Sequence, residues 1–263
     1  MKTSESYLKY FKKIEKNIVQ GLEKPPETFE KEDYHKFRVE IKKLNAFLIS
    51  LEFCLRSFKK NTYFKSIKNL FKQTGKIRNC QLEQSILQEN GSHFIDQYLF
   101  HLEQRIKKEK IKFASLHNQM RPAKIKHLLG KIKPFIKKID RKDLDLFIES
   151  KRNKINHFFQ IDPLLPANLH TIRKLLKIDF YTRKIIEHPQ ARNLIEEENN
   201  FLELLGKWHD YRIVNNLLEK SILNETVSSN ESDNLLKIKS AILSTSDHLF
   251  ISIKERIHKG VYL

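Results

Sequence analysis

The sequence predicts an all-α protein built from antiparallel helical bundles. Only 6 Gly and 7 Pro are available for turns, and they fall mostly between long periodic segments. Short connections between long helices favour antiparallel neighbours, so bundles are the expected architecture. Apolar residues recur at helical spacing in segments near 4–20, 31–60, 62–88, 93–118, 121–138, 142–160, 167–187, 191–221 and 232–259.

The composition indicates a strongly basic chain with an ordinary core. Hydrophobic residues make up 40% of the 263 residues, which is enough to bury a substantial core. The 50 Lys and Arg residues exceed the 32 Asp and Glu residues, and the formal net charge of +18 attracts anions. Solvated lysines in a chain of biased composition are a plainer interpretation, and charge alone does not decide between the two.

The cysteines and the apolar runs indicate a protein without disulfides or membrane spans. Cys54 and Cys80 are the only cysteines, so neither a disulfide framework nor a Cys-rich metal site is expected. No apolar run approaches the roughly 20 residues that a membrane span needs. The Lys-rich start of the chain also lacks an apolar signal core. We therefore expect a soluble cytoplasmic protein with no metal and no cofactor.

The second predicted helix carries two stripes. Its apolar residues alternate spacings of three and four, which predicts an uninterrupted buried seam from Phe37 to Phe58. Beside this seam lie His35, Arg38 and Lys42, which fall within roughly a 60° arc at about 100° per residue. One ligand can therefore touch all three basic side chains.

The pattern His-x-x-Arg-x-x-x-Lys appears again about 135 residues later, as His170, Arg173 and Lys177. A glycine element follows each copy, Gly75–Asn79 after the first and Gly206–Asp210 after the second. Glycine inside a helix costs about 1 kcal/mol relative to alanine, so its use twice suggests a close approach of two helix backbones or a bend. The repetition of both elements in the same order predicts an internal duplication.

The duplicated stripes favour anion binding. Like charges on adjacent helical turns repel by a few tenths of a kcal/mol per pair, so a row of His, Arg and Lys without interleaved acids is unfavourable unless an anion is present. A lone histidine on a helix is more often structural, but two matched stripes make binding the better interpretation. The duplication divides the chain into predicted halves 1–138 and 139–263.

On these residues the chain resembles the CHAD family, whose name stands for conserved histidine α-helical domain. Each half looks like that family's basic His-x-x-Arg helix followed by a Leu-Gly-x-x-x-Asp type of element. The matching segments are His35–Lys43 with Gly75–Asn79, and His170–Tyr181 with Leu205–Asp210. The resemblance spans nearly the whole chain. It implies two four-helix bundles related by an approximate twofold, with a basic central cleft that binds inorganic polyphosphate.

The predicted site is therefore a polyphosphate-binding surface without catalytic residues. Arginine can hold phosphate oxygens bidentately, and lysine acts as a mobile point charge. Bound phosphate should favour charged histidine, so binding is expected to weaken as the pH rises from about 6 to 8. The predicted binding residues are His35, Arg38, Lys42, Lys43, Lys76, Arg78, His170, Arg173, Lys177 and Lys207.

Two other function classes stay open. A nonspecific nucleic-acid-binding protein would use the same phosphate attraction, although most aromatic residues follow buried helical phases. An enzyme acting on phosphorylated metabolites is less favoured, because the sequence has no G-x-x-x-x-G-K-[ST] loop and no HExxH motif. We expect a binding protein in the cytoplasm, with polyphosphate granules as a location that follows from its ligand.

Overall fold

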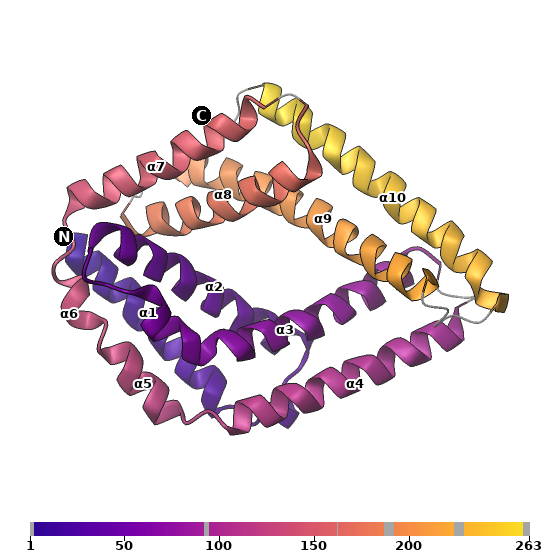
Figure 1. Cartoon of the computed structure of the whole chain (residues 1–263), viewed down its shortest axis with the longest axis horizontal. Helices are drawn as coiled ribbons and strands as arrows, with labels where there is room; N and C mark the ends of the chain where they lie inside the picture. Colours follow the sequence, from indigo (N-terminus) through magenta and orange to yellow (C-terminus); the bar gives the residue numbers. More distant parts are fainter. Residues whose placement is uncertain (1–2, 92–94, 162, 187–191, 224–228, 260–263) are drawn as a thin grey trace. The chain divides into compact units, whose positions relative to one another are not determined.

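The computed structural model describes residues 3–91, 95–161, 163–186, 192–223 and 229–259 (Figure 1). Every regular element in these residues is a helix, so the predicted all-α class is confirmed. In chain order the elements are α1 (Thr3–Glu23), the short 3-10 helix η1 (Pro26–Thr28), α2 (Lys31–Cys54), α3 (Lys60–Glu89), α4 (Asp96–Asn118), α5 (Pro122–Gly130), α6 (Lys133–Ile136), α7 (Arg141–Phe159), α8 (Pro166–Ile186), α9 (Arg192–Leu223) and α10 (Ser229–His258).

Two of the predicted helices end differently from expectation. Helix α2 stops at Cys54, after which the chain turns and packs Phe58 against Tyr63 and Phe135, with ring centroids 5.0 and 5.2 Å apart. The fifth predicted segment forms two helices, α5 and α6, because Pro134 has no N–H for a continuous helix and restricts the residue before it. Both differences come from local breaks that an apolar period alone does not reveal.

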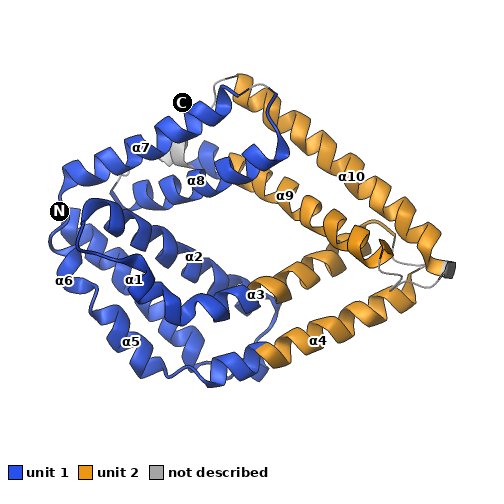
Figure 2. Cartoon of the chain, viewed as in Figure 1, with its two compact units in different colours: residues 1–74, 113–199 blue, residues 75–112, 200–263 orange. Residues whose placement is uncertain are grey.

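The chain divides into two compact units, coloured separately in Figure 2. Helices α3, α4 and α9 contribute residues to both units, so each unit draws on both halves of the sequence. The predicted division into two sequence halves related by a twofold stays a prediction. The first unit comprises Met1–Thr74 and Phe113–Asn199, and the second comprises Gly75–Lys112 and Asn200–Leu263.

The second unit is a helical bundle around one apolar core. Segments of α3, α4, α9 and α10 all contribute buried side chains to it, among them Leu87 and Val214. Glu231 of α10 ties two of these helices together, because its carboxylate accepts hydrogen bonds from the backbone N–H groups of Gln97 and Tyr98 at 2.8 and 2.9 Å. A carboxylate at this position satisfies donors that the first turn of α4 leaves without helical partners.

In the first unit, α2 packs against α1, α7 and α8. The predicted apolar seam of α2 is buried from Phe37 to Leu51. The prediction that it continues without interruption to Phe58 is wrong, because the helix ends at Cys54 and Leu55 is half-buried. Burying side chains of this size stabilises the fold by about 1.5–3 kcal/mol each, so the seam fixes which face of α2 points inward. The buried seam residues of α2 are Phe37, Ile41, Leu44, Leu48 and Leu51.

An aromatic cluster packs under the N-terminal part of α2. Phe29 and Tyr34 both lie against Phe113 of α4, with ring centroids 5.2 and 5.0 Å apart. His117, one turn further along α4, also contacts this cluster, and its Nε2 lies 3.0 Å from the carbonyl oxygen of Gly21. Because a carbonyl only accepts, Nε2 donates this hydrogen bond. These contacts hold the start of α2 against α1 and α4.

Gly21 allows α1 to approach α2 closely. A Cβ on Gly21 would lie only 2.4 Å from Cδ2 and 2.8 Å from Cε2 of Phe37, whose side chain is buried. The sequence predicted a close approach of two helix backbones, or a bend, at Gly75 and Gly206. At Gly206 an added Cβ would meet no heavy atom of the described residues within 4 Å, so close packing does not explain that glycine.

Replacing Gly21 with alanine should lower the free energy of unfolding by about 1–3 kcal/mol, because the buried Phe37 ring must shift to admit the methyl group. Gly130→Ala in α5 is the control, since a Cβ added there meets no heavy atom of the described residues within 4 Å. That control should leave stability unchanged or raise it by up to about 1 kcal/mol. Urea unfolding followed by circular dichroism measures both, and equal effects would contradict the close packing of α1 on α2.

Candidate anion-binding surface

The two predicted basic stripes lie on α2 and α8, which pack against each other in the first unit (Figure 1). The structure therefore brings the two copies of the His-x-x-Arg-x-x-x-Lys pattern onto neighbouring helices. His35 is exposed. The other stripe residues of this unit are half-buried, namely Arg38, Lys42, Lys43, His170, Arg173 and Lys177.

Asp33 caps the start of α2. Its Oδ2 accepts hydrogen bonds from the backbone N–H of Glu30 at 2.9 Å and from Nζ of Lys24 at 2.7 Å. The Lys24 ammonium and this backbone N–H hold the pKa of Asp33 below its usual range. The first helical stripe residue, His35, thus follows a turn whose backbone donors are partly satisfied by side chains.

Arg38 is held in place by α3. Its Cζ lies 4.3 Å from the ring centroid of Phe71, and its Nη1 donates to the carbonyl oxygen of Phe71 at 2.8 Å. A planar guanidinium can stack on a ring and donate hydrogen bonds in its own plane at the same time. Phe71 was not among the predicted site residues, because its sequence position shows only an aromatic residue in a helix.

Lys43 is paired with an acid. Its Nζ lies 2.6 Å from Oε1 of Glu40, and the two side chains are 28% and 13% exposed. Glu40 lies two residues from both Arg38 and Lys42, and residues at that spacing point to different faces of a helix. The i,i+3 spacing of the pair was visible in the sequence, but only the structure shows that this carboxylate pairs with Lys43.

Tyr181 of α8 lies within electrostatic range of the stripe residue Arg173 and of Glu40 on α2. Burial raises the pKa of Tyr181, the Arg173 charge opposes this change, and the Glu40 carboxylate adds to it. The pKa of Tyr10 of α1 is also raised, first by burial and then by the nearby Tyr181 and Glu40. Tyr181 of α8 therefore lies within electrostatic range of Tyr10, Arg173 and Glu40, and Tyr10 of α1 lies within range of Glu40 of α2.

His170 lies in an environment that disfavours its charged form. Burial lowers the pKa of His170, and the neighbouring charges of Lys174 and Arg173 lower it further. Without a bound anion, the imidazole is therefore mostly neutral near neutral pH. A phosphate group next to this histidine would act in the opposite direction.

Three predicted binding residues belong to the second unit. Lys76 and Arg78 follow Gly75 within α3, and Lys207 follows Gly206 within α9. Lys76 and Lys207 are exposed, and Arg78 is half-buried. The surface on α2 and α8 is built from the first unit's residues, and a role for these three stays a prediction.

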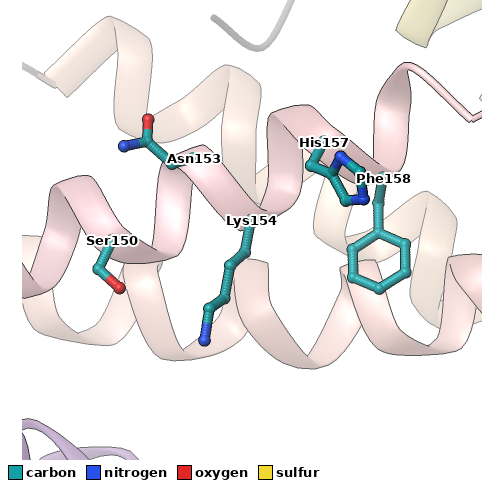
Figure 3. A pocket seen from close by; sticks show the side chains of 5 residues that line it. All are labelled: Ser150, Asn153, Lys154, His157 and Phe158. Carbon is teal, nitrogen blue, oxygen red and sulfur yellow. The ribbon is translucent and has the colours of Figure 1, made fainter.

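An open pocket of about 440 Å³ lies on one helix, α7, and contains none of the predicted binding residues (Figure 3). The pocket is lined by Ser150, Asn153, Lys154, His157 and Phe158.

In the described part of the chain, no three His, Cys, Asp or Glu side chains form a group that could hold a metal ion. None of the described helices is both long and apolar enough to cross a membrane.

Two solved structures are similar to this chain over almost its whole length. The crystal structure of the CHAD domain from the plant Ricinus communis matches with a TM-score of 0.81 and 14% sequence identity, covering 98% of this chain and 92% of that chain. The chain has the CHAD fold. PptA from Streptomyces chartreusis matches with a TM-score of 0.72 and 11% identity, covering 97% of this chain and 99% of that chain. No family model and no curated protein sequence matches, so the CHAD fold is established by the structural comparison.

Arg38→Lys should lower the free energy of unfolding by about 0.5–1.5 kcal/mol, because lysine keeps the charge but loses the stacked geometry and the hydrogen bond to Phe71. Arg56→Lys is the matched control, since Arg56 is exposed in the turn after α2. Denaturant unfolding of both variants measures the difference. If they lose the same stability, Phe71 does not hold Arg38.

Proposed function

We propose that this CHAD-fold protein binds inorganic polyphosphate, without altering it chemically, through the cations of α2 and α8. The observation that carries the proposal is the position of two basic stripes with identical spacing on two helices that pack together. Polyphosphate is a flexible chain of closely spaced anionic charges. Cations on successive helical turns can neutralise successive phosphates, and the release of counterions adds entropy. The resemblance of the sequence to the CHAD family implies the same ligand.

The stripe residues have different roles in this proposal. Arg38 and Arg173 engage phosphate oxygens with paired N–H donors, and Phe71 sets the orientation of Arg38 in advance. Lys42 and Lys177 contribute point charges that can follow a flexible polymer. Binding takes place in the cytoplasm in this proposal, and polyphosphate granules are a location that follows from the ligand.

The formal net charge of +18 favours a second candidate, nonspecific nucleic-acid binding. This candidate needs only a basic surface, whereas the polyphosphate proposal needs the two stripes. The two candidate functions therefore predict different results when cations are removed. Polyphosphate binding should weaken more when stripe cations are lost than when other surface cations are lost.

Binding to long-chain polyphosphate, double-stranded DNA and single-stranded RNA should be measured at equal phosphate concentration and about 0.15 M salt. We expect polyphosphate to bind most tightly. Arg38→Gln/Arg173→Gln should weaken that binding by about tenfold or more, because two charge-assisted contacts are lost. The control, Lys107→Gln/Lys108→Gln, removes the same charge from exposed positions of α4 and should have a much smaller effect.

Circular dichroism would show that both double variants remain folded. Equal binding of all three polymers, with equal losses in the two variants, would contradict the polyphosphate proposal. That result would identify the chain as a general electrostatic binder of polyanions.

Affinity for polyphosphate should fall as the pH rises through the range set by His170. Burial and the neighbouring cations lower the pKa of this histidine in the unliganded protein, and bound phosphate raises it, so binding takes up a proton. Affinity is then highest below the unliganded pKa and becomes constant above the liganded pKa. His170→Gln should flatten this dependence in titrations from about pH 5 to 8. A slope that is the same with and without His170 would show that its protonation is not coupled to binding.

A further inference from the structure

Glu40 is an acid that pairs with Lys43, one of the cations predicted to bind phosphate. It lies two residues after Arg38 on α2, and its carboxylate is 2.6 Å from the Lys43 ammonium. With only 13% of its side chain exposed, Glu40 is less accessible than Lys43, of which 28% is exposed. The pair is therefore shielded from solvent more than an ordinary surface ion pair.

The surroundings of Glu40 favour keeping the pair intact. The Glu40 charge raises the pKa of Tyr10 of α1 and of Tyr181 of α8, so the carboxylate lies within electrostatic range of two other helices of the first unit. Removing one partner from a largely buried ion pair leaves the other charge without compensation, which is strongly unfavourable. A phosphate that attracted Lys43 would have to leave Glu40 in that state.

The second copy of the motif supports this view of the pair. The residues five and eight positions after His170 are Leu175 and Ile178, where the first copy has Glu40 and Lys43 after His35. One copy thus has an ion pair and the other has two apolar side chains. In both copies the two positions together carry no net charge, so the stripes match in charge only if Lys43 is counted with Glu40.

We propose that Glu40 withholds Lys43 from the anionic ligand and thereby sets the affinity of this surface. Lys42, which lies in the stripe with His35 and Arg38, supplies the lysine contact of α2. Lys43 stays neutralised in the complex. This inference rests on the proposed polyphosphate binding and removes Lys43 from the set of residues that contact phosphate.

Three variants test the inference through the salt dependence of polyphosphate binding. Glu40→Gln frees Lys43, so the slope of log affinity against log salt should steepen by about 0.7–0.9, which corresponds to one added phosphate contact. Glu32→Gln makes the same charge change on the same helix. The Glu32 side chain is 63% exposed, and its Oε1 lies 3.9 Å from Nζ of Lys36. Because this is an exposed, weak ion pair, its loss should leave the slope unchanged.

The third variant, Glu40→Leu/Lys43→Ile, copies the residues of α8 and avoids leaving either charge buried alone. It should bind polyphosphate with the wild-type affinity and salt slope. If its slope of log affinity against log salt is shallower by about 0.7–0.9, Lys43 already contacts the ligand in the wild-type protein and the inference is overturned. The same conclusion follows if Glu40→Gln and Glu32→Gln behave alike.

Acylation of Lys43 in the protein without ligand tests the ion pair independently of polyphosphate. The rate at Lys43, measured by mass spectrometry relative to exposed Lys107 of α4, should rise in Glu40→Gln and stay unchanged in Glu32→Gln. An unchanged rate at Lys43 in Glu40→Gln would overturn the inference even if polyphosphate binds. A wild-type protein that fails to bind polyphosphate would instead reject the proposed function, and the acylation rates would still decide whether Glu40 holds Lys43.

Discussion

Apolar packing under a row of like charges is the constraint on which the proposed surface depends. On α2, buried Phe37 and Ile41 each precede a basic residue, Arg38 and Lys42. Burial of such side chains contributes about 1.5–3 kcal/mol each. Repulsion between cations on adjacent turns opposes it by only a few tenths of a kcal/mol per pair. Packing therefore decides the orientation of the helix, and the cations are kept together in spite of their repulsion.

The buried residues beneath the two basic stripes differ between α2 and α8. Nine residues after the histidine, α2 has the buried Leu44, whereas α8 has the buried Asp179. Asp179 accepts a hydrogen bond at 2.7 Å from Nε of Arg183, which is also paired with Glu198 near the start of α9. Breaking a buried pair by removing one partner costs about 3–5 kcal/mol. The duplicated pattern is thus a property of the surface, and the packing below it differs between the copies.

The helical class and the buried faces could be predicted because they depend on a local period. The buried part of the α2 seam follows from spacings of three and four in the sequence. The close approach at Gly21 could not be predicted in this way, because it depends on where the Phe37 ring of another helix lies. Contacts between helices are set by tertiary packing, and the apolar period of a single helix carries no information about its neighbours.

The sequence predicted the basic residues of the candidate site but did not reveal the side chains that hold them in place. The stripes of α2 and α8 could be recognised because a helix brings residues three and four apart onto one face. The ring of Phe71 beneath Arg38, and the carboxylate of Glu40 beside Lys43, come from contacts whose sequence spacing fits many arrangements. The charge that a ligand meets on this surface therefore depends on the folded structure as well as on the count of basic residues.

A crystal structure of the full chain with a polyphosphate of defined length would test the central claim most directly. The account predicts phosphate groups along α2 and α8, with oxygens within hydrogen-bonding distance of the Arg38 and Arg173 guanidinium groups. Phosphate density confined to other cations, such as Lys107 and Lys108 of α4, would contradict it.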